Sequence, residues 1–210
     1  MAIQPIQYET LLSVCTDHEG ALALLKHHRP YLEAVPSMRR PEESVITLPL
    51  PNIRVRDAVH LNPQGPGIAP GAVMTLPCDV ALLMCDPEWK IKTGIEILIY
   101  IHRPQEDFSD LLMRWRHTQI LCDRGYEWLL PQKHEHLLSD GTDKSHPLFV
   151  VFPETPDHIL QGLRGAGLPT VVLPLGQTET LSFEPESDLE IGDIPELDDI
   201  DTSALESPDE

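Results

Sequence analysis

The pattern of hydrophobic and polar positions is clearest in residues 77–131, where it predicts strand, hairpin, strand, helix and strand in that order. Apolar side chains dominate residues 77–84 and 91–101. Continuous apolar runs bounded by turn residues are typical of buried strands. An amphipathic run over residues 106–122 predicts the helix, and an aromatic run over residues 126–130 predicts the last strand.

The amino-terminal third contains one helix start and two apolar runs of strand length. Residues 16–19 fit a capping box with Thr16 as the N-cap, so a helix should begin there. It should end before Pro30, because the residue that precedes a proline avoids the helical region. Residues 45–50 and 53–61 predict two strands.

The carboxyl-terminal part predicts a strand, a helix and a second strand. Residues 148–152 are continuously apolar, Asp157 suits a helix start, and Gly165 and Gly167 suit a helix end. Residues 169–175 then predict a short strand. This spacing indicates a compact βαβ unit with parallel strands. The elements together predict an α/β or α+β fold with a mixed central sheet and flanking helices.

The length and the charge distribution predict one domain followed by a tail. A chain of 210 residues can form one domain with an extension. Residues 179–210 hold 13 acidic residues and no Lys or Arg, so most of the net charge of −19 lies there. We expect a globular domain over residues 1–176 and a disordered acidic tail over residues 177–210. This charge disfavours nucleic acid as a partner.

The acidic tail also carries aliphatic side chains, which a purely solubilising segment does not need. They are Leu189, Ile191, Ile194, Leu197, Ile200 and Leu205. Alternating acidic and apolar residues suit a disordered segment that folds on a basic, grooved protein partner. The tail could instead lie back on the basic helix around Arg114 and Arg116, or remain solvated.

The chain lacks the sequence features of membrane insertion and of secretion, so we expect a cytoplasmic protein. No apolar run reaches the roughly 18 residues that a membrane-spanning helix needs. The first residues lack a basic region followed by an apolar one. The four cysteines show no CxxC spacing, which favours reduced, buried thiols.

Two acidic side chains, Asp79 and Glu96, interrupt the predicted apolar strands. A buried carboxylate is costly unless it is paired or binds a metal. With a turn at Asp86-Pro87, residue 79 would lie opposite residue 94, which makes Glu96 a diagonal neighbour of Asp79. The two carboxylates could then hold Mg²⁺ or Mn²⁺, and the ion would activate water for attack on a phosphodiester. Plain structural roles for both acids are the alternative.

Short motifs in this stretch resemble those of the PD-(D/E)XK nuclease superfamily, and the nearest branch is its Uma-two type of endonuclease. They are Pro77-Cys78-Asp79, Gly94-Ile95-Glu96-Ile97-Leu98 and Tyr126-Glu127-Trp128-Leu129-Leu130-Pro131. The resemblance implies that Asp79 and Glu96 are catalytic, metal-binding acids. It also implies that Arg114 and Arg116 on the intervening helix stabilise the developing negative charge.

The motifs also depart from the superfamily pattern. Cys78 stands between the proline and the aspartate, and Glu96-Ile97-Leu98 lacks the lysine. Arginine, which the helix offers instead, is not interchangeable with lysine. Two functions therefore stay open. The first is a metal-dependent nuclease-like protein, either active or catalytically degenerate. The second is a non-enzymatic interaction or adaptor protein whose acidic tail recruits a basic partner.

Overall fold

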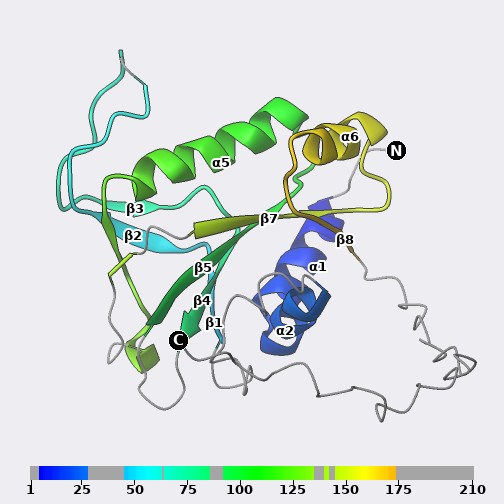
Figure 1. Cartoon of the computed structure of the whole chain (residues 1–210), viewed down its shortest axis with the longest axis horizontal. Coiled ribbons are helices and arrows are strands. Elements are labelled where there is room, and N and C mark those ends of the chain that lie inside the picture. Colours follow the sequence, from blue (N-terminus) through cyan, green and yellow to red (C-terminus); the bar gives the residue numbers. More distant parts are fainter. Residues whose placement is uncertain are drawn as a thin grey trace, which may run out of the picture. The chain divides into compact units, whose positions relative to one another are not determined.

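A mixed five-stranded sheet with helices on both faces forms the centre of the structure (Figure 1). The computed structural model describes residues 5–27, 45–62, 64–85, 92–134, 140–141 and 145–173. The chain divides into two units, Met1–Gly176 and Gln177–Glu210, and all the described residues belong to the first. The predicted fold class is confirmed for these residues. The predicted disordered tail lies outside them.

The five strands of the central sheet follow the order β1-β4-β5-β7-β8. The first three are antiparallel neighbours, whereas β5, β7 and β8 run parallel. Their bounds are β1 Val45–Pro49, β4 Val80–Cys85, β5 Lys92–Ile101, β7 Ser145–Val151 and β8 Thr170–Val172. Helix α6 (Asp157–Gly165) connects β7 to β8, which confirms the predicted parallel strand–helix–strand unit.

A second, smaller sheet has the order β3-β2-β6 and is antiparallel throughout. Its strands are β3 Val73–Thr75, β2 Asn52–Val55 and β6 Tyr126–Trp128. The expected strand over residues 53–61 is thus shorter. Strand β3 was not predicted, because three residues are too few for a detectable alternation. The predicted strand at residues 126–130 exists, but it pairs with β2.

The helices cover the two faces of the central sheet (Figure 1). Helices α1 (Pro5–Thr16) and α2 (His18–His27) pack on the face that includes Val80, Leu82 and Ile99. Helix α5 (Phe108–Cys122) and helix α6 pack with the small sheet on the opposite face. Alternate residues of β4 and β5 therefore point into two separate apolar clusters. The 3₁₀ turn η1 spans Gln132–His134.

The start of α2 differs from the expected capping box. Helix α1 extends through Thr16, whose hydroxyl donates to the Ser13 carbonyl inside that helix. Asp17 takes the N-cap position instead, because its carboxylate accepts the Gly20 backbone N–H at 3.1 Å. The prediction of Thr16 as N-cap is therefore wrong by one residue.

Candidate functional site

Asp79 lies at the end of the sheet where β4 begins and β5 ends. Its backbone N–H donates to the Ile99 carbonyl, and its own carbonyl accepts from the Leu50 N–H, both at 2.8 Å. These bonds extend the β4 pairing by one residue and fix the direction of the side chain. The side chain is fully buried.

The carboxylate of Asp79 accepts hydrogen bonds from four donors. The Tyr8 hydroxyl donates at 2.8 Å, the Ile101 backbone N–H at 2.7 Å and the Arg103 guanidinium at 2.8 Å. The Arg114 guanidinium donates to Oδ2, which also accepts the Ile101 N–H, whereas Tyr8 and Arg103 donate to Oδ1. A carboxylate has about four lone-pair sites, so its hydrogen-bonding capacity is filled. The charge-assisted bonds offset the cost of burying the carboxylate.

Arg114 joins helix α5 to this end of the sheet. It is only 11% exposed, and its side chain also donates to the carbonyls of Pro77 and Ile101, at 3.0 and 3.1 Å. The same guanidinium contacts both carboxylate oxygens of Glu106, at 3.1 and 3.2 Å. Nearly all of its donors are therefore used inside the protein, and Arg114 does not belong to a solvated basic face.

Arg103 and Glu106 come from the turn between β5 and α5. The Glu106 carboxylate accepts the Arg103 backbone N–H at 2.9 Å, which closes the turn. The Arg103 side chain is 41% exposed and also lies 5.9 Å from the centre of the Tyr8 ring. Burial lowers the pKa of Arg103, but the hydrogen bond and the charge of Asp79 outweigh this effect and raise it. Tyr8, Asp79, Arg103, Glu106 and Arg114 are called the Asp79 cluster below.

The Asp79 cluster is electrically balanced, because two guanidinium groups face two carboxylates. Burial, followed by the charge of Asp79 and the hydrogen bond to it, raises the pKa of Tyr8 from 10.0 to about 12. The hydroxyl therefore stays protonated and donates to Asp79 throughout the physiological range. Tyr8 ties α1 to the same carboxylate that Arg114 ties to α5.

The raised pKa of Tyr8 predicts a loss of stability at alkaline pH. Between about pH 10 and pH 12 the unfolded chain releases the Tyr8 proton, whereas the folded chain retains it. The contribution of Tyr8 is therefore complete below pH 10 and is lost as the pH rises through 12. We expect the difference in unfolding free energy between wild type and Tyr8→Phe, about 1 kcal/mol at neutral pH, to shrink over this range. Urea denaturation at several pH values measures it, and a difference that stays constant would contradict the prediction.

Glu96 is also fully buried, but it lies elsewhere on β5. It pairs with Leu83 across the β4–β5 ladder, and Ile99 pairs with Val80. Its carboxylate accepts the Trp128 indole N–H at 2.7 Å and the Tyr126 hydroxyl. Glu96 thus links the central sheet to β6 of the small sheet.

The expected proximity of Asp79 and Glu96 is wrong. Glu96 lies opposite Leu83, four positions along the chain from Asp79, which corresponds to about 14 Å at 3.4 Å per residue. The assumed tight turn at Asp86-Pro87 would place Cys85 opposite residue 88, whereas Cys85 pairs with Lys92. The register then shifts again between Leu83 and Cys85. Asp86 and Pro87 lie outside the described part of the chain.

Of the four predicted site residues, the structure brings together Asp79 and Arg114 and separates the other two. Arg116 is exposed on α5 and borders a shallow groove on the outer side of that helix. Three functional candidates of the Asp79 cluster were missed, namely Tyr8, Arg103 and Glu106. Arg103 lies two residues beyond the end of a buried strand, and a charged residue at such a position is a recognisable signal. Tyr8 lies in a helix that was not predicted.

The Asp79 cluster does not fit a divalent metal ion. Within the described segments there is no group of three or more His, Cys, Asp or Glu side chains that could hold one. Mg²⁺ and Mn²⁺ prefer about six oxygen ligands. An ion at Asp79 would have to displace two guanidinium groups, and their positive charges oppose its approach. The metal-binding role expected for Asp79 and Glu96 therefore has no geometric support.

Comparisons with known proteins found no family model, no curated protein and no solved structure that matches this chain. In the part of the chain that the structure covers, no helix has both the length and the apolar character needed to cross a membrane. The four cysteines are free thiols, and Cys15, Cys78 and Cys85 are buried.

Proposed function

We propose that this chain is a nuclease-like protein with a catalytically silent acid centre, and that it acts by binding a protein partner. The order of its elements supports the resemblance to the nuclease superfamily. The strand that directly follows Asp79 pairs with the strand that carries Glu96, a helix with basic residues follows, and an aromatic strand comes next. The resemblance concerns the ancestry of the chain, whereas the side chains of the Asp79 cluster determine whether it has catalytic activity.

The observation that carries the proposal is the occupied carboxylate of Asp79. Two arginines, one tyrosine and one backbone N–H fill its acceptor sites. A metal-dependent nuclease needs acids that are open to an ion and to its activated water. Here the guanidinium groups of Arg103 and Arg114 occupy the places next to the Asp79 carboxylate where an ion would bind.

The strand beside Asp79 supports the same proposal. The backbone of Ile101 and the side chain of Arg103 contact the Asp79 carboxylate directly. An apolar residue and an arginine thus stand next to Asp79, in the spacing at which the superfamily pattern has an acid and a lysine. The Glu96 that was assigned to this pattern is bonded to Trp128 instead.

The acidic segment at residues 179–210 favours binding as the remaining function. It holds 13 acidic residues and no Lys or Arg, with aliphatic residues interspersed. Such a composition suits recognition of a basic, grooved protein surface, and it disfavours nucleic acid. The segment lies outside the described residues, so this support comes from the sequence.

A cleavage assay combined with a metal titration tests the silent centre. We expect no cleavage of plasmid DNA, single-stranded DNA or RNA by the full chain with Mg²⁺ or Mn²⁺. We also expect no rise of the melting temperature beyond that caused by the same ionic strength of NaCl. An ion that binds only the folded state at 100 times its Kd would stabilise it by about 2.7 kcal/mol.

Asp79→Asn is the control for both measurements. Cleavage by the wild type that the variant loses would refute the proposal, and so would a metal-induced shift that the variant loses. If the variant does not fold, Tyr8→Phe serves instead, because it removes one Asp79 contact and leaves both arginines in place.

A further inference from the structure

The outer side of helix α5 is unusual for a surface helix. Surface helices normally present polar residues to solvent. Here Leu112, Met113 and Trp115 line a shallow groove of about 500 Å³ together with three polar residues, Ser109, Arg116 and Gln119. Met113 is 52% exposed. We call this surface the α5 groove.

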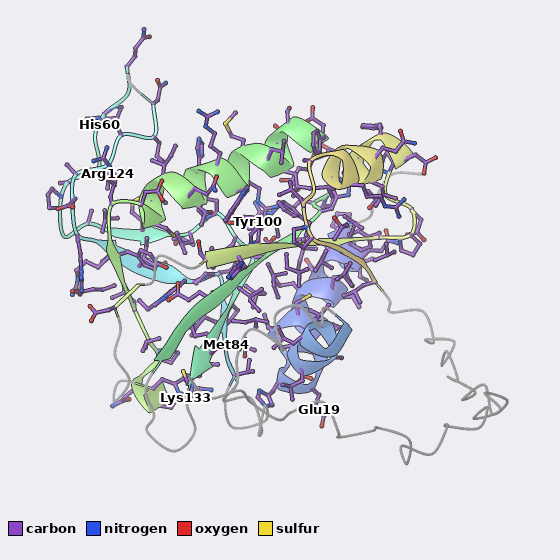
Figure 2. The ribbon with its side chains drawn as sticks, in the orientation of Figure 1. Glu19, His60, Met84, Tyr100, Arg124 and Lys133 are labelled. Atoms are coloured by element: carbon purple, nitrogen blue, oxygen red, sulfur yellow. The ribbon has the colours of Figure 1, made fainter. Side chains whose placement is uncertain are left out.

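The residues of the α5 groove are the types that binding interfaces favour. Aromatic residues, Met and Arg are enriched at the buried centres of interfaces, and Trp and Arg dominate among binding hot spots. Met113 offers a flexible, polarizable contact that adapts to different partners. Trp115 is fixed in place, because its ring packs edge-on against Tyr100 with 5.8 Å between the ring centres. Tyr100 lies between α5 and the sheet (Figure 2).

Arg116 gives the α5 groove a charge. Within the part of the chain that the structure describes, the side chain of Arg116 has no ion-pair or hydrogen-bond partner. This contrasts with Arg114, two residues earlier on the same helix, which is paired with two carboxylates. Asp107 and Asp110 form the capping box at the amino end of α5, so that end of the helix is acidic. A ligand with a negative charge should therefore place it near Arg116 rather than over the first turn.

We infer that the α5 groove binds an acidic amphipathic helix of a protein partner. The partner would place Leu or Ile side chains at i, i+3, i+4 and i+7 on Leu112, Met113 and Trp115. It would place a carboxylate against Arg116. Helix α5 has 15 residues and is about 22 Å long, so a partner helix of similar length can follow it. This acidic helix differs from the basic surface expected to bind residues 179–210, so the inference adds a second binding surface to the proposed function and rests on its binding role.

Fluorescence anisotropy with two synthetic peptides tests the inference on the full chain. Both peptides have the length of α5 and carry Leu at the four anchor positions, with Glu at the remaining positions in one peptide and Lys in the other. We expect saturable binding of the Glu peptide, weakened by added salt because screening shortens the range of the Arg116 charge. Met113→Ser and Arg116→Glu should each weaken binding about tenfold or more, as hot-spot changes do.

The matched control is Arg124→Glu. Arg124 is exposed and lies beyond the carboxyl end of α5 (Figure 2), outside the α5 groove. The Arg124→Glu substitution changes the net charge by the same amount as Arg116→Glu. It should leave the Kd for the Glu peptide within about twofold of the wild-type value, because rim charges contribute little. Arg116→Glu should in turn bind the Lys peptide better than the wild type does. A gain of this kind cannot come from a folding defect.

Three results would overturn the inference. One is the absence of saturation by the Glu peptide up to about 1 mM, where specific binding is negligible. Another is an equal loss of affinity for the Glu peptide in Arg124→Glu and Arg116→Glu, which would indicate a nonspecific charge effect. The third is self-association in sedimentation that Met113→Ser abolishes, since the occupant would then be a second copy of the chain. None of these results alters the cleavage and metal assays, so a failure of the α5 groove is distinguishable from a failure of the silent centre.

Discussion

Asp79→Asn is expected to lower the free energy of unfolding by about 3–5 kcal/mol, the range for removing one partner of a buried ion pair. The asparagine side chain has the same shape, but it carries no charge and turns one acceptor oxygen into an NH₂ donor. Depending on its orientation, that donor would face either the donors of Tyr8 and Arg103 or those of Arg114 and the Ile101 backbone N–H. Urea denaturation at pH 7 of wild type and variant, with a common m-value, gives the difference.

Asp140→Asn is the matched control for this prediction. Asp140 also pairs with an arginine, Arg56, but its side chain is 58% exposed. Exposed ion pairs contribute about 0–1 kcal/mol, so this variant should be nearly as stable as the wild type.

The sign of the Asp79→Asn effect separates the two roles that the sequence left open for Asp79, namely ion binding and a structural role. An acid retained for ion binding sits in a site that is strained without its ion, and neutralising such an acid tends to stabilise the protein. An acid with a structural role destabilises the protein when it is neutralised. A variant as stable as the wild type, or more stable, would contradict the silent centre even if no cleavage were detected.

The sheet could be predicted from the sequence because its strands are nearly uniform in character. All six residues of β4 are buried, and its apolar run predicted a two-sided buried strand. The βαβ unit of β7, α6 and β8 was also predictable, since Asp157 and Gly165 mark the ends of its helix. Helix α1 was missed, although Tyr8, Leu11, Leu12 and Cys15 have the i, i+3, i+4, i+7 spacing of a buried helix face.

The candidate site could be predicted only in part. Asp79 is visible in the sequence as an acid inside an apolar run, and the resemblance to the nuclease superfamily pointed to Arg114 on the following helix. Tyr8 is not visible as a partner of Asp79, because it is 71 residues away in the chain. The position of Glu96 depended on the strand register. Cys85 pairs with Lys92 rather than with residue 88, as a turn at Asp86-Pro87 would require, and the irregular step between Leu83 and Cys85 adds a further shift.

Helix α5 connects the Asp79 cluster with the α5 groove. Arg114 attaches the inner side of the helix to the sheet through two carboxylates and two backbone carbonyls. Arg116 and Met113 lie on the outer side. A rigidly attached helix presents its outer residues in a fixed arrangement, which reduces the ordering cost of binding. In this interpretation the buried ion pairs keep a binding surface in place.

Glu96→Leu is expected to lower the free energy of unfolding by about 2–4 kcal/mol, since each buried donor that loses its acceptor costs about 1–3 kcal/mol. The Trp128 indole N–H and the Tyr126 hydroxyl both donate to this carboxylate, and Glu96 and Trp128 are buried. Because a buried charge is itself costly, removing the charge of Glu96 offsets part of this loss of stability. Glu96→Gln keeps one acceptor oxygen and should cost less. Urea denaturation of both variants measures the two effects.

A double-mutant cycle with Trp128→Phe tests whether the Glu96 contact itself is responsible. In the wild type Trp128→Phe removes the donor and leaves a buried carboxylate with one fewer bond. In the Glu96→Leu background the same change removes a donor that has already lost this acceptor, so it should cost less by about 1 kcal/mol or more. Equal costs in both backgrounds would show that the two side chains do not interact. A coupling of the expected sign would establish Glu96 as the bond between the central sheet and β6, in place of the metal-binding role that its sequence context suggested.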